Sequence, residues 1–281
     1  MKYAKADGKN TEATPKARAV CLCCGETLIS KCGSVKIWHW SHFPKRHCDK
    51  WWENETEWHR NWKNLFPREN QEVVLFDEVT GEKHIADVKT KDGLVIELQN
   101  SPMTESELVS RENFYKNMVW VVNGTNFLKQ FVVFPFTLPP PDSDLAKDLH
   151  ILRQPFLVTN KNASHYNVID KEGRKFFKPI LVRKSKGTKY SGVVTYEIMT
   201  VSPKQTIDTT ADLQSEIDII YEGHHFFDWK NRREVWFKSV KNVFIDFGGQ
   251  LICQLCSFDK ETYCIKLIDK AKFITNNGGN I

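Results

Sequence analysis

The sequence HIADVKT, residues 84–90, followed after a short gap by LVIELQ, residues 94–99, decides the fold. Both segments are rich in aliphatic residues and flanked by polar ones, a pattern that predicts two β-strands. The gap is KDG, residues 91–93. It fits a three-residue hairpin loop with glycine in the left-handed conformation. The sequence therefore predicts a β-hairpin.

That loop places Asp87 opposite Glu97, with Gln99 on the same face, because side chains alternate along a strand. The opposite face is apolar and holds Ala86, Val88, Ile96 and Leu98. Two opposed carboxylates repel each other. A divalent cation between them removes that repulsion, and Mg²⁺ or Mn²⁺ prefers carboxylate oxygens. The hairpin therefore predicts a metal site.

An alternative register stays open at this point. A two-residue loop, Asp92-Gly93, would place Asp87 and Glu97 on opposite faces of the hairpin. A solvent-facing hairpin, with Asp87 balanced by Lys89, is the alternative to a metal site.

A helix is predicted before the hairpin, over residues 51–66. Asn54 and Glu57 fit a capping box, and Pro67 ends the helix. Two rows follow helical spacing. The apolar row is Trp58, Trp62, Leu65 and Phe66, and the polar row is Glu55, His59 and Lys63.

The elements around the hairpin complete an ordered set. Residues 71–77 predict a strand, and Thr104 with Glu107 forms a capping box that opens a helix through residue 116. The run VWVV, residues 119–122, predicts a short buried strand. The predicted order is helix, three strands, helix, strand.

This order resembles the core of the PD-(D/E)xK nuclease superfamily, and the motifs are most similar to its competence protein CoiA-like subgroup. The resemblance covers roughly residues 20–125. It rests on Glu55-x-x-x-His59-x-x-x-Lys63, Ala86-Asp87-Val88, Ile96-Glu97-Leu98-Gln99-x-Ser101, Arg111-x-x-x-Tyr115 and the VWVV strand.

The resemblance implies a metal-dependent deoxyribonuclease in which Asp87 and Glu97 bind Mg²⁺ or Mn²⁺. Glu55 or His59 would contribute from the helix, so the candidate catalytic residues are Asp87, Glu97, Gln99, Glu55 and His59. Gln99 stands where the broad superfamily has Lys, and glutamine carries no charge. Lys63 or Lys89 would supply the missing charge. A non-catalytic nucleic-acid-binding protein with a degenerate nuclease core is the alternative.

A second candidate site lies upstream. Cys21 and Cys24 form a Cys-x-x-Cys pair, and later His and Cys residues complete a set typical of structural Zn²⁺. We expect Cys21, Cys24, His42 and Cys48 as ligands. His39 is the main rival, and Cys23, Cys32 or His47 are substitutes. The run His-Trp-Ser-His-Phe, residues 39–43, is similar to a stretch of CoiA-like proteins in which a small zinc element precedes the nuclease core.

Candidate nucleic-acid contacts come from basic and aromatic residues. Residues 171–189 contain eight Lys or Arg and one Glu. Such a patch can follow a phosphate backbone, although a solvated hairpin is an equal alternative. The candidates are Lys63, Lys89, Arg111, Tyr115, Lys175 and Lys178.

The expected organisation is an α+β (or α/β) chain of three parts. These are a zinc-binding element at residues 1–50, a nuclease-like core at 51–138, and a β-rich domain at 145–281 after the run of three prolines at 139–141. In the third part we expect strands at 176–183, 192–201, 243–247, 251–258 and 263–268, with helices at 145–152 and 211–219. The first 19 residues are expected to be flexible or an edge element.

Composition limits the partners and the compartment. The formal net charge is +5, so the distribution of charge matters more than its total. No apolar run is long enough to span a membrane, and there is no signal-peptide pattern. The chain has 8 cysteines, which without a secretory signal indicate a reducing cytoplasm and metal binding. DNA is the expected partner, with a further protein of a DNA-processing or defence system.

Overall fold

The computed structural model spans residues 1–281 and describes all of them except 45–47, 153–166, 170–174, 178–179, 184–212 and 261. The described chain is α+β and forms two compact units. The first unit comprises Met1–Val132, Phe227–Leu255 and Ile265–Ile281, and the second comprises Val133–Phe226 and Cys256–Cys264.

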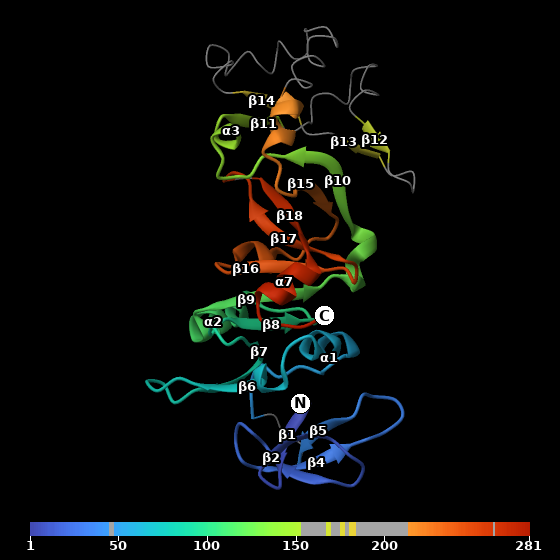
Figure 1. Ribbon diagram of the computed structural model, residues 1–281, viewed down its shortest axis with the longest axis vertical. Helices are drawn as coiled ribbons and strands as arrows, with labels where there is room; N and C mark the ends of the chain where they lie inside the picture. Colours follow the sequence, from blue (N-terminus) through green and yellow to red (C-terminus); the bar gives the residue numbers. More distant parts are fainter. Residues whose placement is uncertain (45–47, 153–166, 170–174, 178–179, 184–212, 261) are drawn as a thin grey trace. The chain divides into compact units, whose positions relative to one another are not determined.

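The N-terminal part of the first unit is a five-stranded sheet, drawn in blue in Figure 1. Its order is β2-β1-β3-β4-β5, so β2 is an edge strand while β1 and β3 lie inside the sheet. Part of the first 19 residues is therefore interior sheet and not a flexible or edge segment. The strands are β1 (Tyr3–Ala6), β2 (Lys9–Glu12), β3 (Arg18–Val20), β4 (Thr27–Lys31) and β5 (His39–His42).

A mixed sheet follows, in the order β17-β16-β9-β8-β7-β6 within the first unit. The β6, β7 and β8 strands are antiparallel neighbours, whereas β8, β9 and β16 are parallel. The bounds are β6 (Gln71–Phe76), β7 (Lys83–Lys89), β8 (Val95–Gln99), β9 (Met118–Asn123), β16 (Asn242–Asp246) and β17 (Leu251–Ser257).

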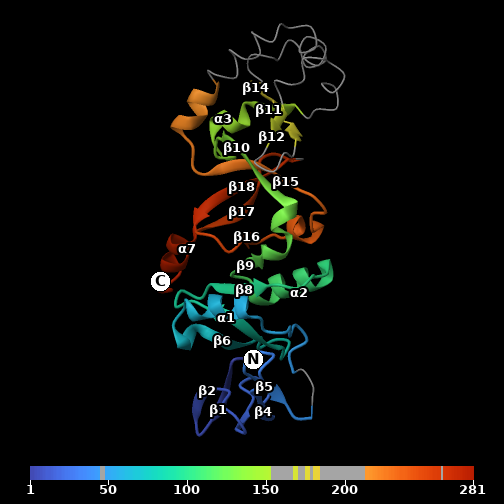
Figure 2. The same ribbon diagram turned by 90° about the vertical axis from the view of Figure 1, so that its right-hand side faces the viewer.

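Two helices flank this sheet, as both ribbon views show (Figures 1 and 2). The helices are α1 (Glu57–Asn64) and α2 (Glu105–Tyr115). Trp62 and Phe66 pack with Val88, Ile96 and Leu98 in one apolar core. The other face of the sheet holds Glu97 and Trp120, which bond to α2 residues. The order of helix, three strands, helix and strand matches the sequence prediction.

The start of α1 differs from the prediction. Residues 51–56 are not helical, and Thr56, not Asn54, is the N-cap. The Thr56 side chain accepts a hydrogen bond from the His59 N–H, and the His59 side chain accepts one from the Thr56 N–H. This reciprocal pair satisfies two free donors of the helix end. Trp51 instead stacks on His84, with ring centroids 3.2 Å apart.

The second unit has its own apolar core, which includes Leu138, Leu149, Leu213 and Ile217. Residues 213–219 are helical, as predicted. The predicted helix at 145–152 is wrong in its second half. It stops at Lys147, and Leu149–Leu152 forms strand β11, which pairs with β14. A short apolar run fits either a helix or a strand, and here the pairing with β14 makes residues 149–152 a strand.

The remaining elements complete the bounds. They are η1 (Arg68–Asn70), η2 (Thr125–Gln130), β10 (Phe131–Leu138), α3 (Asp144–Lys147), β11 (Leu149–Leu152), β12 (Asn167–Ile169), β13 (Lys175–Phe177), β14 (Ile180–Arg183), β15 (His224–Trp229), η4 (Glu234–Lys238), β18 (Tyr263–Asp269) and α7 (Lys270–Asn276). Strands predicted near 243–247, 251–258 and 263–268 are present, and the one at 192–201 lies outside the described residues. The single strand predicted at 176–183 is instead two strands, β13 and β14, which pair with β12 and β11 respectively.

The compact units do not follow the predicted division at residues 138–145. The segments 227–255 and 265–281 fold with the N-terminal half. The cause is β16, which pairs in parallel with β9 from Asn242 opposite Val119 to Asp246 opposite Asn123. Residues 243–246 of β16 are all buried, as is typical of a strand inside a parallel sheet.

Candidate functional site

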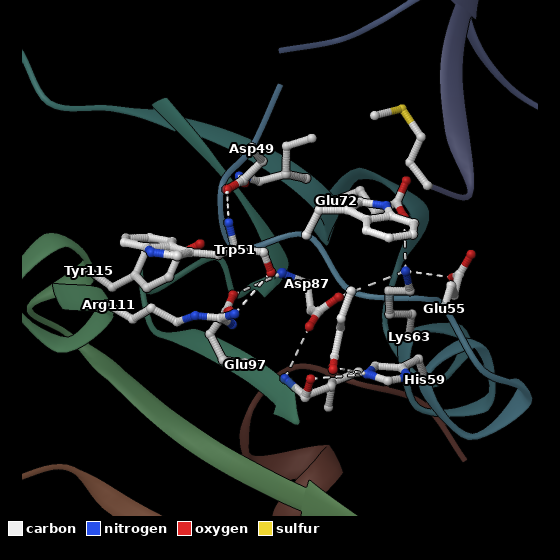
Figure 3. A pocket seen from close by; sticks show the side chains of 15 residues that line it. Asp49, Trp51, Glu55, His59, Lys63, Glu72, Asp87, Glu97, Arg111 and Tyr115 are labelled. Carbon is white, nitrogen blue, oxygen red and sulfur yellow. Dashed lines mark hydrogen bonds and ion pairs between the residues drawn. The ribbon is translucent and has the colours of Figure 1, made fainter. Parts of the chain in front are cut away.

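A small acidic pocket lies in the first unit, where α1, β6, β7 and β8 meet (Figure 3). Its volume is about 80 Å³. A space of this size admits an ion with a few waters. The carboxylates that line it are Asp49, Glu53, Glu55, Glu72, Asp87 and Glu97, and the cationic or imidazole groups are His59, Lys63 and Arg111.

The predicted hairpin positions the central pair of carboxylates. The Thr90 N–H donates to the Leu94 carbonyl (2.8 Å), and Gly93 has φ +83°. Val88 lies opposite Ile96, which confirms the three-residue loop and excludes the two-residue alternative.

The carboxylates of Asp87 and Glu97 therefore share one face. Each accepts a hydrogen bond from the backbone of the other strand. The Asp87 N–H donates to Glu97 Oε1 (3.2 Å), and the Leu98 N–H donates to Asp87 Oδ2 (3.1 Å). These contacts hold two like charges close together.

Electrostatics in the pocket oppose ionisation of this pair. Burial raises the pKa of Glu97 to about 8, with the Asp87 charge adding to the shift, although Arg111 acts in the other direction. Burial also raises the pKa of Asp87. The Arg111 guanidinium lies 3.2 Å from Glu97 Oε2 and does not neutralise both groups. A divalent cation is the natural complement to such a pair.

Lys63 is the buried cation of the pocket. Its Nζ lies 2.6 Å from Glu55, 2.8 Å from Glu72 and 3.8 Å from Asp87. Burial opposes its charge, but the carboxylates outweigh burial and raise its pKa. In the same way, Lys63 and Arg60 overcome burial and lower the pKa of Glu55 to about 2. Figure 3 shows Lys63 between Glu55 and Glu72.

His59 occupies the other side of the pocket. Its Nε2 lies 2.8 Å from Glu53 Oε1 and 3.1 Å from the Leu98 carbonyl oxygen. Because a carbonyl only accepts, this nitrogen carries a proton. Burial disfavours the charged ring, but Glu53 and Asp87 outweigh it and raise the pKa of His59.

Gln99, the predicted counterpart of the superfamily Lys, lies behind the pocket. Its amide nitrogen donates to the Ser101 carbonyl (3.1 Å) and hydroxyl (3.2 Å) and to Glu53 (3.4 Å). Its side chain is buried and is not among the residues lining the cavity. The charge near Asp87 comes from Lys63 instead.

The six residues predicted to contact nucleic acid do not form one surface in the described part of the chain. Lys63, Arg111 and Tyr115 are buried in the pocket wall, and Lys89 is half-buried on β7. Lys175 begins strand β13, and Lys178 lies outside the described residues. The structure therefore brings Lys63 and Arg111 to the carboxylates, where they balance charge.

Sequence reasoning missed Glu53, Glu72 and Asp49. Glu53 accepts from the backbone N–H groups of Asn100 and Ser101. Glu72 has φ +51°, and its carboxylate bonds Lys63 and the Lys2 and Tyr3 N–H groups. Only the polar interruption at the start of the apolar β6 run signalled Glu72.

Asp49 joins the pocket to the N-terminal element. Its carboxylate lies 2.8 Å from His84 Nδ1 and accepts from the N–H groups of Ile85 and Trp51, both at 2.9 Å. Asp49 follows Cys48 directly in the chain. Asp49 therefore connects the cluster residue Cys48 to β7.

The cluster Cys21, Cys24, His42 and Cys48 is the second site, and it is the ligand set predicted from sequence. Its donor atoms all lie within 4.8 Å of one another. The sulfurs of Cys21 and Cys48 are 3.6 Å apart, and Cys24 Sγ lies 3.3 Å from His42 Nε2. A tetrahedral Zn²⁺ with Zn–S of about 2.3 Å needs sulfurs about 3.8 Å apart and a sulfur–nitrogen distance of about 3.5 Å. The cluster fits a zinc ion.

The rival ligands are placed elsewhere. His39 Nδ1 bonds the Ile37 carbonyl oxygen at 2.9 Å. Cys23 and Cys32 are outside the four-residue cluster, although both pack near it. His47 lies outside the described residues. Cys253, Cys256 and Cys264 form no disulfide within the described part of the chain and lie outside the cluster.

Fold and site thus define an α+β protein with a Cys/His cluster that can hold a metal ion, beside a pocket of buried carboxylates. Residues 6–50 match the model of the family "Competence protein CoiA, N-terminal domain". This match confirms the resemblance to the CoiA-like family, and it contains all four cluster residues. The pocket hairpin lies outside the matched residues. Searches of curated proteins and of solved structures found no match.

Among the described residues, no helix has the length and apolarity needed to cross a membrane.

Proposed function

We propose that the protein is a metal-dependent nuclease that hydrolyses phosphodiester bonds of DNA, with a PD-(D/E)xK type of core and a role in DNA processing. The observation that carries the proposal is the pairing of Asp87 and Glu97 on one face of the hairpin, beside Lys63. Two buried acids with raised pKa values and a specific cation partner mark a functional site.

Asp87 and Glu97 would hold Mg²⁺ or Mn²⁺, because their oxygens converge on the pocket. Such an ion polarises a phosphate and lowers the pKa of a water. Glu55 is tied to Lys63 and Arg60, so its role is to fix the charge of Lys63 and not to bind the metal.

The remaining residues supply charge and protons. Lys63 keeps a positive charge 3.8 Å from Asp87, where it stabilises negative charge that develops on a phosphate. His59 holds a proton at Nε2 at the pocket wall and is suited to exchange it with a reacting oxygen. Glu53 fixes the orientation of His59.

A structural Zn²⁺ in the cysteine cluster completes the proposal. Thiolate and imidazole donors suit zinc, and free thiols require a reducing compartment, so we place the protein in the cytoplasm. No cysteine in the described part of the chain forms a disulfide.

Cleavage of DNA by the purified, zinc-loaded protein tests the activity. Single- and double-stranded DNA are incubated with Mg²⁺ or Mn²⁺, using wild type, Asp87→Asn and Glu97→Gln. We expect cleavage that requires the divalent ion and falls at least ~100-fold in both variants, since each removes a charge at the reacting centre.

The matched control is Glu107→Gln, which removes another carboxylate that bonds Arg111 but lies outside the cavity lining. This variant should cleave like wild type. Cleavage that persists in Asp87→Asn and Glu97→Gln at equal zinc content would place the activity elsewhere.

A second candidate function rests on Gln99. Gln99 stands where the superfamily has Lys, and its neutral amide is used in internal hydrogen bonds. This position therefore supplies no charge to the pocket. A non-catalytic DNA-binding protein is therefore the alternative, and DNA binding without cleavage under every metal condition would favour it.

A further inference from the structure

An open groove runs along the N-terminal element, next to the cysteine cluster. It is lined by β4, β5, the loop at residues 32–38 and the segment that leads toward α1, and its volume is about 1130 Å³. This is far larger than the acidic pocket, so the groove can take a polymer segment where the pocket takes an ion.

The charge of the groove is positive. Lys31 and Lys36 line it and are exposed, and within the described part of the chain neither forms an ion pair. Among the described lining residues Asp49 is the one carboxylate, and it is engaged by His84 and Ile85. The net field at the groove therefore favours an anion.

Aromatic side chains also face the groove. Phe43 is 64% exposed and Trp52 is 40% exposed. Exposed aromatic rings beside lysines are the combination with which proteins bind single strands, because a ring stacks on any unpaired base while the cations contact phosphates. In a duplex the base faces are already stacked on one another, so these rings select a single strand.

The groove leads to the acidic pocket. Asp49, Trp52 and Ile85 line both cavities. A polymer that lies in the groove therefore contacts residues that also line the acidic pocket.

We propose that this groove binds single-stranded DNA and guides it to the pocket. The inference rests on the proposed function for the choice of DNA. Phe43 and Trp52 stack on bases, and Lys31 and Lys36 contact phosphates.

Fluorescence anisotropy with a labelled oligothymidylate tests the groove. The full zinc-loaded chain is used, with Ca²⁺ in place of Mg²⁺, and the variants are Phe43→Ala and the double change Lys31→Ala with Lys36→Ala. We expect Phe43→Ala to weaken binding about tenfold, the loss expected for one stacked base. The double lysine variant should reduce the salt slope of log K by about 1.4.

The matched controls change equally exposed residues away from the groove. They are Phe76→Ala, whose ring is 54% exposed, and Lys83→Ala with Lys91→Ala, which should bind like wild type. Phe43→Leu removes the ring but keeps an apolar side chain, and this variant should lose affinity for the oligothymidylate as Phe43→Ala does. A zinc content equal to that of wild type shows that the cluster beside Phe43 is intact in each variant.

Duplex DNA and oligouridylate serve as competitors. We expect both to compete at least ~5-fold less well than the DNA single strand. Equal binding of duplex, tighter binding of RNA, or unchanged affinity in the groove variants would overturn the proposal.

The two proposals fail in different ways. DNA binding that depends on the groove residues, without cleavage, would contradict the proposed nuclease activity and support the groove proposal. Cleavage that depends on Glu97, with unchanged DNA binding in the groove variants, would contradict the groove proposal and support the nuclease activity.

Discussion

The cysteine cluster and the acidic pocket lie in the same compact unit, but they are built in opposite ways. The cluster takes all its ligands from residues 21–48, and thiolates and a neutral imidazole are the forms in which such side chains bind a metal. The pocket gathers Met1 and residues between Asp49 and Tyr115, and its carboxylates need cations from other elements. A soft site can therefore be specified by local spacing, whereas a buried acidic site depends on tertiary packing.

The largest expected effect concerns the cysteine cluster. Cys24→Ser removes a ligand, and we expect zinc affinity to fall more than ~100-fold, beyond the loss usual for outer-shell partners. Cys32→Ser, a nearby thiol outside the cluster, should retain zinc. Zinc content after dialysis against a competing chelator measures both. Equal loss in the two variants would contradict the ligand set.

Lys63 tests the pocket side of the comparison. Lys63→Met leaves Glu72 buried without this cation and Glu55 paired with Arg60 alone, and breaking a buried pair costs about 3–5 kcal/mol. Lys89→Met, which changes a half-buried lysine on β7, should cost under about 1 kcal/mol. Urea unfolding at constant zinc content compares them. A loss of zinc in Lys63→Met would show that the two sites are not separable.

The pH dependence of stability isolates Glu97. Its pKa is raised from 4.5 to about 8, so the folded state binds a proton that the unfolded state releases. Stability from this group is complete below pH 4.5 and is lost as the pH rises through 8. Without added divalent ions, we expect the free energy of unfolding to fall by about 2 kcal/mol between pH 6 and pH 8.

Glu97→Gln has no group that titrates here, and its unfolding free energy should change less over this range. Urea unfolding at several pH values, with zinc retained, gives the comparison. An equal slope in wild type and Glu97→Gln would assign the dependence to another group.

The smallest expected effect concerns the cap of α1, which carries His59 and Lys63 to the pocket but no ligand of the cluster. Thr56→Ala should cost about 1 kcal/mol, the usual value of an N-cap. Asn54→Ala, at the cap position predicted from sequence, should change stability by less than about 0.5 kcal/mol. Thermal unfolding measures the stability of both variants. A larger loss in Asn54→Ala than in Thr56→Ala would favour Asn54 as the N-cap, as the sequence predicted.

The hairpin and the cluster could be predicted because their information is local. Gly93 and the spacing of Asp87 and Glu97 fix the register within 11 residues. The apolar stripe of α1 was likewise readable, since Trp62 and Phe66 pack as their spacing requires.

The features that the sequence did not predict depend on partners that are distant in sequence or of an unexpected residue type. Glu53 and Glu72 are ordinary acidic residues until folding brings them to His59 and Lys63. The cap at Thr56 escaped notice because its partner is a histidine in place of Glu or Gln. The pairing of β16 with β9 joins segments more than 100 residues apart, which no local pattern reveals.

A manganese titration followed by electron paramagnetic resonance tests the central claim most directly. The zinc-loaded protein should bind Mn²⁺ at the acidic pocket, and Asp87→Asn and Glu97→Gln should lose this binding while zinc content stays equal to wild type. Mn²⁺ binding that persists in both variants, or that disappears with Cys24→Ser while the pocket residues are intact and the protein is folded, would contradict a separate carboxylate site.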